Sequence, residues 1–184
     1  MKHLLLSAAL LLPGLAAADE ISDALTAAQE AYADGDIQYA LDELDFARNK
    51  LLEAKTNQLG SFLPEAPDGW TREVSSEMNQ GLAMMGGGVG AEATYTSGSG
   101  DESYKITLMA DNPMVASMAA MVTNAAAMGF QVERVGRQRF MVQDNEMTGL
   151  VANRFLVQIS GADPETMTAA LESMDFAALA GFGQ

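Results

Sequence analysis

The methionines are the residues whose type and spacing could do the most distinctive chemistry in this chain. Met114, Met118 and Met121 recur at i, i+4 and i+7, which places their thioethers on one face of a predicted helix. Met84 and Met85 lie in a glycine-rich stretch before that helix. Thioethers are soft ligands that suit Cu(I) or Ag(I), although methionine is also an adaptable filler of hydrophobic cores. We expect either a thioether metal site, closed by the glycine-rich stretch, or core packing at these positions.

The sequence lacks most other catalytic and metal-binding side chains. It has no cysteine and a single histidine, His3. His3 lies in the predicted signal peptide, so the mature chain would offer no thiolate or imidazole ligand and no Ser-His-Asp triad. The many carboxylates form no recognisable catalytic pair. We therefore expect no enzyme and no catalytic residue, with a carboxylate-dependent hydrolase as the third candidate function.

The main basic cluster lies in the C-terminal half and consists of Arg134, Arg137, Arg139 and Arg154. On adjacent strands, Arg137, Arg139 and Arg154 could bind an anion or an acidic partner, because a guanidinium group can donate two parallel hydrogen bonds. Salt bridges with the abundant acidic residues are the alternative interpretation.

The net charge is strongly negative. The whole chain carries −15 at pH 7, and removal of Lys2 with the signal peptide would leave 9 basic residues against 25 acidic ones, a net charge of −16. Binding to nucleic acid requires a basic face, so nucleic acid is excluded as an expected partner. The acidity favours solubility, or attraction to cations and basic partner surfaces.

Residues 1–18 are typical of an export signal. Lys2 is followed by an apolar run from Leu4 to Leu15, and Ala16-Ala17-Ala18 fits the small-residue rule for signal peptidase. The apolar run is shorter than the roughly 20 residues that a membrane-spanning helix needs. We therefore expect cleavage near Ala18, a periplasmic or secreted mature chain, and no stable membrane anchor after cleavage.

Residues 19–60 are predicted to form a helical hairpin. Asp34-Gly35-Asp36 breaks the helical pattern, and the second helix has an apolar stripe with charged residues largely off it. The stripe consists of Ile37, Leu41, Leu44, Ala47, Leu51 and Ala54. Such a hairpin either packs within the protein, forms a homodimer, or docks a partner through residues such as Tyr32.

Small residues in this hairpin follow a known repeat pattern. The spacing of Ala28, Tyr32, Gly35-Asp36, Ala40 and Ala47 resembles a single tetratricopeptide unit, in which small residues let paired helices approach closely. No second unit follows, and stacked repeats need neighbours to bury their faces. We therefore expect no solenoid groove.

Residues 61–69 form a proline-rich junction that ends directly before Trp70, the only tryptophan. Pro64 and Pro67 hold the residues before them extended, and Asp68-Gly69 is a turn signal. The junction therefore ends a helix and starts a strand. We expect Trp70 to fill the core where the two parts of the chain meet.

Residues 70–184 are predicted to form an antiparallel sheet of about five to six strands with two helices on one face, so the fold class is α+β. The expected strands cover residues 71–75, 91–97, 103–110, 130–135, 139–143 and 149–160. The glycine-rich stretch 78–90 is predicted to be a flexible loop. Asn112-Pro113 and Asp163-Pro164 are predicted helix starts. The helix 113–128 is apolar nearly all round, which predicts burial.

Several of these features together resemble a family of exported bacterial proteins from Leu63 onward. The matching residues are Leu63-Pro64, Pro67, Gly69-Trp70, Met84-Met85-Gly86-Gly87-Gly88, Asp111, Pro113-Met114 and Asn153-Arg154-Phe155-Leu156-Val157. The resemblance implies export but no activity or catalytic residue. The layout is also similar, at the level of fold alone, to the PsbP and Mog1 type of α/β sandwich.

These observations predict an exported acidic binding or interaction protein of the bacterial envelope with no evident catalytic activity. Its expected partner is an unidentified envelope protein, bound through the hairpin or the sheet surface. The alternative function is binding of Cu(I) or Ag(I) through the methionines.

Overall fold

The computed structural model describes residues 13–183. The chain divides into two compact units between Ala54 and Lys55. Residues 1–12 of the predicted signal peptide at 1–18, which include His3, lie outside the described residues. No helix in the described part of the chain is long and apolar enough to cross a membrane.

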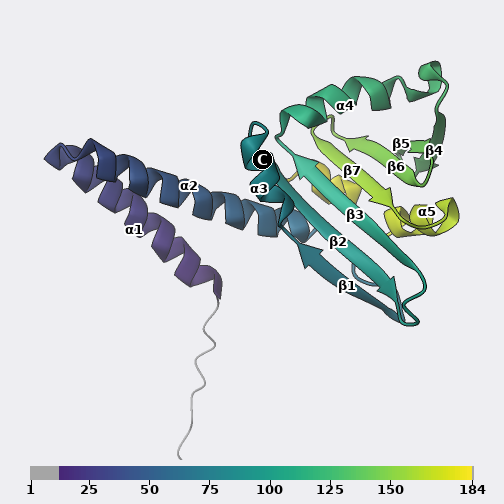
Figure 1. Ribbon diagram of the computed structural model, residues 1–184, viewed down its shortest axis with the longest axis horizontal. Helices are drawn as coiled ribbons and strands as arrows, with labels where there is room; N and C mark the ends of the chain where they lie inside the picture. The colour runs from purple at the N-terminus through teal and green to yellow at the C-terminus, as the bar shows by residue number, and fades with distance from the viewer. Residues whose placement is uncertain (1–12, 184) are drawn as a thin grey trace, which may run out of the picture. The chain divides into compact units, whose positions relative to one another are not determined.

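The first unit is a pair of antiparallel helices, α1 (Pro13–Asp34) and the greater part of α2 (Ile37–Gly60) (Figure 1). The predicted break at 34–36 is confirmed. Gly35 adopts the left-handed conformation, with φ 83°, that commonly ends a helix. Asp36 then caps α2, because its Oδ1 accepts a hydrogen bond from the backbone N–H of Tyr39 at 3.1 Å.

Alanines form the contact between these helices. The buried residues of the hairpin are Ala24, Ala28 and Ala31 of α1 and Ala40 and Ala47 of α2. The predicted apolar stripe of α2 does not form the contact between the helices, except at Ala47. Its other members, Ile37, Leu41, Leu44, Leu51 and Ala54, are exposed.

The second unit is built on a seven-stranded sheet of order β1-β2-β3-β7-β6-β5-β4, in which every pair is antiparallel. The strands are β1 (Trp70–Ser75), β2 (Val89–Ser97), β3 (Ser103–Ala110), β4 (Gln131–Val135), β5 (Gln138–Gln143), β6 (Glu146–Val151) and β7 (Phe155–Ser160). The predicted α+β class with an N-terminal helical hairpin is confirmed, with seven strands in place of five or six.

The extra strand arises from a turn inside the predicted strand 149–160. Ala152 and Asn153 have φ values of 52° and 53°, and the Arg154 N–H donates to the Val151 carbonyl at 3.1 Å. Positive φ at both central residues defines a type I′ turn, which joins two strands into a hairpin. Alanine is not typical of turns, so the apolar pattern on both sides of Ala152 predicted one continuous strand.

The helices of the second unit are α3 (Met78–Met84), α4 (Pro113–Thr123), the 3-10 helix η1 (Ala125–Met128), α5 (Pro164–Glu172) and α6 (Phe176–Ala180). Both predicted helix starts are confirmed. Asn112 accepts from the Met114 N–H at 2.8 Å, and Asp163 accepts from the Glu165 and Thr166 N–H groups at 2.9 and 3.1 Å. The predicted burial of α4 is only partly correct, because Ala116, Ser117 and Ala120 are exposed.

The predicted flexible loop at 78–90 contains ordered structure instead. Met78–Met84 form α3, and Val89 and Gly90 belong to β2. Asn79 fixes the two elements together, since its side chain donates to the Gly90 carbonyl at 2.8 Å and accepts from the Gly90 N–H at 2.7 Å. A Cβ atom on Gly90 would lie 2.6 Å from Met78 Sδ, so a larger residue there would require the Met78 side chain to shift.

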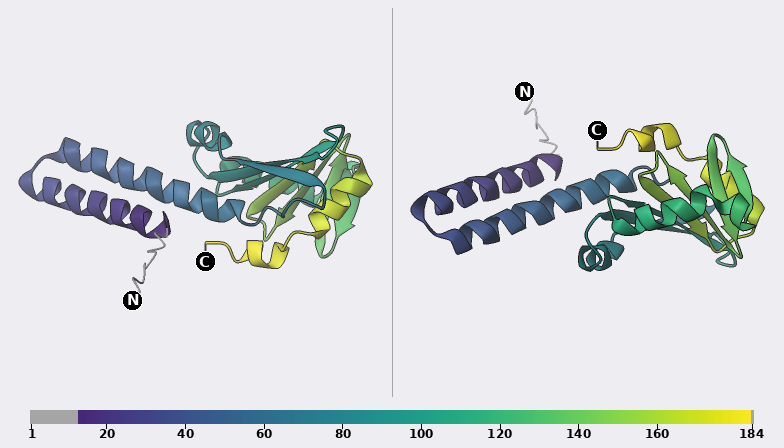
Figure 2. Two further views of the ribbon diagram at one scale, coloured as in Figure 1. Left: turned by 90° about the horizontal axis from the view of Figure 1, so that it is seen from below. Right: turned by 90° about the horizontal axis from the view of Figure 1, so that it is seen from above.

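Both faces of the central strands are covered. Phe155, Leu156 and Val157 of β7 are all buried, although neighbours along a strand point to opposite faces. Leu156 packs with Val115 of α4 on one face. On the other face the Phe155 ring contacts Phe182, which follows α6, at 5.8 Å. Figure 2 accordingly shows α3 and α6 on opposite sides of the sheet.

The helix α5 lies on the same face as α6. Thr168 of α5 contacts the Met147 sulfur of β6 at 4.0 Å, and Met147 is the register partner of Ile159. Ile159 shares a face of β7 with Phe155 because the two are four residues apart. The expectation of two helices on one face is therefore corrected: α3 and α4 cover one face, and α5 and α6 cover the other.

Asp111 joins segments of the second unit that are far apart in sequence. Its carboxylate accepts hydrogen bonds from Arg154 Nε at 3.1 Å, Arg154 Nη2 at 3.3 Å and Lys55 Nζ at 2.7 Å. Arg154 Nη1 donates to the Phe182 carbonyl at 2.7 Å. The hydrogen bonds from Arg154, assisted by Lys55, hold the pKa of Asp111 below its ordinary value.

We predict that Asp111→Asn lowers the free energy of unfolding of the sheet unit by about 1–2 kcal/mol at pH 7, because a charge-assisted, partly exposed pair is lost. A lowered folded-state pKa stabilises the fold above the unfolded value of about 3.9 and ceases to do so as pH falls through the folded value. The difference between the two proteins should therefore be constant from pH 7 to about 5 and shrink below about 4.

Urea unfolding followed by Trp70 fluorescence measures this difference, since Trp70 lies in the sheet unit. Asp101→Asn is the matched control, because it removes an acidic charge from the exposed β2–β3 turn. An equal loss of stability in both variants, or a difference that stays constant down to pH 3, would contradict the assignment to Asp111.

Candidate functional site

The hairpin carries a continuous set of large exposed apolar side chains. Six of them, each between 45 and 71% exposed, form what we call the apolar hairpin face: Leu25, Tyr32, Ile37, Leu41, Leu44 and Leu51. An exposed apolar patch of this kind on a single chain is typical of an interaction site. Tyr32, the hairpin residue predicted to contact a partner, is its most exposed member.

Helix geometry places these residues on one side of the alanine seam. Each residue turns the helix by about 100°, so Leu25 and Tyr32 of α1 flank the seam on the same side as the leucines of α2. The ion pair between Lys50 Nζ and Glu20 Oε2, at 2.9 Å, bridges the opposite side of the seam. Tyr39 and Phe46 are also exposed, and they lie on that opposite side.

The predicted arginine cluster is not brought together as one site. Arg154 is engaged by Asp111 and the Phe182 carbonyl, and its guanidinium carbon lies 5.0 Å from the centre of the Phe155 ring. Arg137 and Arg139 line a different, open cavity of about 350 Å³ at the end of α4, together with Gln138 and Asn153.

The β4–β5 arginines do not make the expected salt bridges. Arg139 is the register partner of Arg134, so two like charges face each other across β4 and β5. Both are exposed, as is Arg137, and within residues 13–183 none of the three forms an ion pair. Basic side chains on an edge strand such as β4 also discourage pairing with other strands.

The methionines fall into two groups. Met114 and Met118 of α4 pack with Met78 of α3 against a buried cluster that contains Met109. Met84 and Met85, at the end of α3, are 87 and 55% exposed, and Met121 is half-buried. The described residues contain no group of three or more histidine, cysteine or acidic side chains that could hold a metal.

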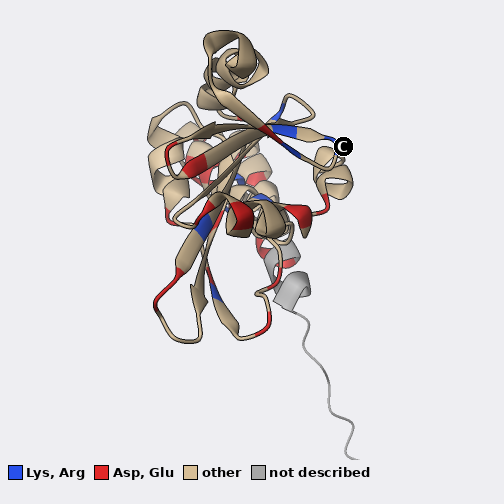
Figure 3. Cartoon of the chain, turned by 90° about the vertical axis from the view of Figure 1, so that its right-hand side faces the viewer, with Lys and Arg blue, Asp and Glu red and all other residues tan. Residues whose placement is uncertain are grey.

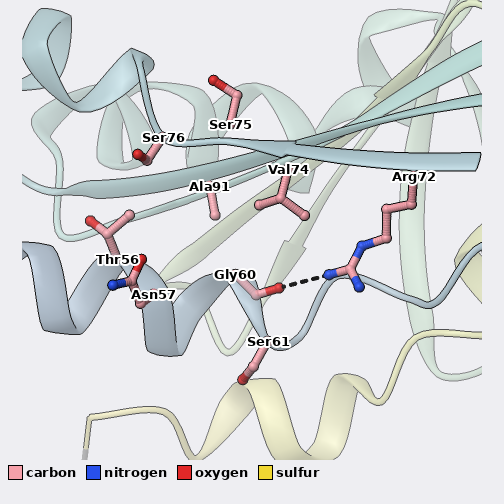
Figure 4. Close-up of a pocket in the computed structure, with 9 residues that line it drawn as sticks. All are labelled: Thr56, Asn57, Gly60, Ser61, Arg72, Val74, Ser75, Ser76 and Ala91. Carbon is pink, nitrogen blue, oxygen red and sulfur yellow. Dashed lines mark hydrogen bonds between the residues drawn. The ribbon is translucent and has the colours of Figure 1, made fainter. Parts of the chain in front are cut away.

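A pocket of about 330 Å³ lies between the end of α2 and β1 (Figure 4). Thr56 and Asn57 of α2 lie across it from Ser76, and Arg72 lies at one end. Its other lining residues are Gly60, Ser61, Val74 and Ala91. No sequence motif indicated this pocket, because it depends on the packing of residues 56–61 against a strand that begins at Trp70.

Arg72 is incompletely satisfied at this pocket. Its Nη1 donates to Glu65 Oε1 at 3.1 Å, and its Nη2 donates to the Gly60 carbonyl at a long 3.4 Å. Its Nε is buried without a hydrogen-bond partner. Next to it, burial raises the pKa of Tyr95 to about 12, so the Tyr95 hydroxyl remains protonated and donates to the Pro64 carbonyl at 2.6 Å.

A second groove, of about 440 Å³, is lined by Trp70, Tyr104 and Pro67 with Glu65 and four residues of the α5 segment, Thr166, Ala169, Ala170 and Ser173. Trp70 is half-buried, and its ring lies 5.3 Å from that of Tyr104. Trp70 thus packs within the sheet unit against Tyr104 of β3, beside Glu65 and Pro67 of the junction.

Acidic residues dominate both units. Figure 3 shows acidic segments spread over helices and loops, with few basic segments between them. In the hairpin, residues 19–54 contain 10 acidic residues against Arg48 and Lys50, a net charge of −8. The hairpin that carries the apolar face is therefore strongly acidic overall.

No family model, curated protein or solved structure matches the chain.

Proposed function

We propose that this chain is an exported acidic interaction protein whose apolar hairpin face binds a partner in the bacterial envelope. The observation that carries the proposal is the inverted arrangement of the hairpin: alanines fill the seam between the helices, whereas leucines, isoleucine and tyrosine remain exposed. Burying a side chain such as leucine is worth about 1.5–3 kcal/mol. A partner that covers this face would realise that stabilisation.

The spacing on α2 indicates a helical partner. Ile37, Leu41, Leu44 and Leu51 follow the alternating steps of three and four residues that a coiled-coil seam uses, with Arg48 at the remaining position. An amphipathic helix laid along α2 would place its own apolar stripe against these residues.

The charge of the hairpin indicates that the partner helix is basic. The hairpin carries a net charge of −8. A basic helix gains attraction there, whereas a second copy of the hairpin would bring another −8. Opposite charges across an interface speed association and exclude wrong partners, so we favour a basic amphipathic helix over a homodimer.

The double variant Leu41→Ser/Leu44→Ser should abolish capture of the partner from envelope extract, because it removes the centre of the apolar hairpin face. Tyr39→Ser/Phe46→Ser is the matched control, since these residues are similarly exposed on the opposite side. Captured proteins are identified by mass spectrometry, and circular dichroism verifies that both variants remain helical.

The partner's binding segment should be a basic amphipathic helix, and its binding should weaken by about tenfold or more between 50 and 500 mM salt, as screening increases. Equal capture by both double variants would contradict the assigned face. A dimer of the chain alone in light scattering, lost only in Leu41→Ser/Leu44→Ser, would replace the basic partner with a second copy.

Binding of Cu(I) or Ag(I) is the second candidate function. The observation that favours it is the meeting of Met78, Met109, Met114 and Met118 in one cluster beneath α3 and α4. Met114 and Met118 belong to the predicted set, whereas the exposed Met84 and Met85 would reach a shared ion only if the end of α3 rearranged.

Titration of the metal-free chain with Cu(I) against a competing chelator tests this function. Met118→Leu should weaken retention by about tenfold while costing less than about 1.5 kcal/mol of stability, because the two side chains have similar volumes. Met84→Leu, a change at an exposed position, should leave affinity unchanged. A wild-type chain that releases all its copper to the chelator would contradict the candidate.

A further inference from the structure

We propose that the pocket between α2 and β1 binds a small carboxylate that carries a second hydrogen-bonding group, such as a hydroxy acid or an N-acyl amino acid. The site consists of Arg72 at one end and the unpaired polar groups of Thr56, Asn57 and Ser76 at the other. All of these residues belong to the sheet unit, and the site is separate from the apolar hairpin face.

Arg72 provides the carboxylate-binding end. The Nε–H and one N–H of Nη2 lie on the same edge of a guanidinium group, and this edge makes the paired hydrogen bonds of an arginine–carboxylate contact. In Arg72 that edge has only the long Nη2 contact with the Gly60 carbonyl, and Nε has no partner. A buried donor without an acceptor is unfavourable. A bound carboxylate would draw this edge toward the cavity and accept hydrogen bonds from Nε and Nη2. The one long hydrogen bond to the Gly60 carbonyl would thus be replaced by two strong ones.

The other end of the pocket provides neutral hydrogen-bonding groups. Thr56 is buried, with only 5% of its surface exposed, and its hydroxyl makes no hydrogen bond to any described residue. Asn57 and Ser76 are exposed, and their side chains make no hydrogen bond within residues 13–183. Val74 and Ala91 form an apolar wall between the two ends. A ligand with an acylamino or hydroxyl group beside its carboxylate satisfies both ends at once.

Charge favours a monoanion over phosphate. Arg72 is the only basic residue that lines the pocket, and its Nη1 is already paired with Glu65, whose side chain is 91% exposed. The local charge is therefore close to neutral, inside a chain with a large net negative charge. A carboxylate adds one negative charge to this site, where it shares Arg72 with Glu65, whereas a phosphate dianion would add two, so charge repulsion opposes the monoanion less.

NMR of the chain from Asp19 onward, labelled with ¹⁵N, tests the site directly through the Arg72 Nε–Hε signal. N-acetylglycine should shift this signal downfield in a saturable manner, with a dissociation constant of order 1 mM for so small a ligand. N-acetylglycinamide, the uncharged analogue, and inorganic phosphate should not. Saturation by phosphate but not by N-acetylglycine would overturn the carboxylate assignment. Equal shifts with N-acetylglycine and N-acetylglycinamide would also overturn it.

Three variants assign the roles of the residues. Arg72→Lys lacks the Nε–Hε signal, so it is followed through the backbone amide signals of residues 56–61 and 72–76, which should no longer respond to N-acetylglycine. Thr56→Val, which conserves volume, should weaken N-acetylglycine binding by about tenfold. Glu65→Gln should strengthen binding by several-fold, because it removes the carboxylate that competes for the guanidinium. Arg139→Lys, at the separate cavity, is the matched control. Binding that is unaffected by Thr56→Val and Glu65→Gln would overturn the site even if Arg72→Lys does not fold.

Discussion

Asp111 occupies the left-handed region, with φ 55°, at the point where the chain leaves β3 for α4. Aspartate tolerates this conformation better than most residues, and here it directs the carboxylate toward Arg154 and Lys55. The next residue, Asn112, caps α4 and also donates to the Gly87 carbonyl. The position of α4, the entry to β2, the β6–β7 turn and the C-terminal segment therefore depend on one partly exposed ion-pair network.

Local signals predicted much of this fold. The Asn112-Pro113 and Asp163-Pro164 caps, the break at Gly35 and the alternation of Tyr104, Ile106 and Leu108 all act within a few residues, and the structure contains each of them. The failures lie where tertiary contacts overrule local preference. Ala152 is held at positive φ by pairing of β6 with β7, and α3, at the start of a glycine-rich stretch, is held by Asn79 and by packing over Gly90.

The candidate sites show the same limit. Residue type identified Arg154 as a group able to bind a carboxylate, but the carboxylate it binds is Asp111 within its own chain. Arg72 carried no signal in the sequence, because its importance comes from an incomplete set of partners: Glu65 in the junction and Gly60 at the end of α2. The orphaned Nε can be recognised only when the strand and the helix end are placed side by side.

The small residues of the hairpin mark its seam: Ala28, Ala40 and Ala47, predicted to let the two helices approach closely, are buried. Ala24, Ala28 and Ala31 recur at steps of four and three, and Ala40 and Ala47 are seven apart, which marks a seam as clearly as leucines would. A sequence that needed only a stable hairpin would place leucines in the seam and alanines outside, because burial of larger side chains stabilises more. This chain has the reverse arrangement. Its helices approach closely through alanine, and the side chains with the most apolar surface remain on a face that only another molecule or another segment can cover.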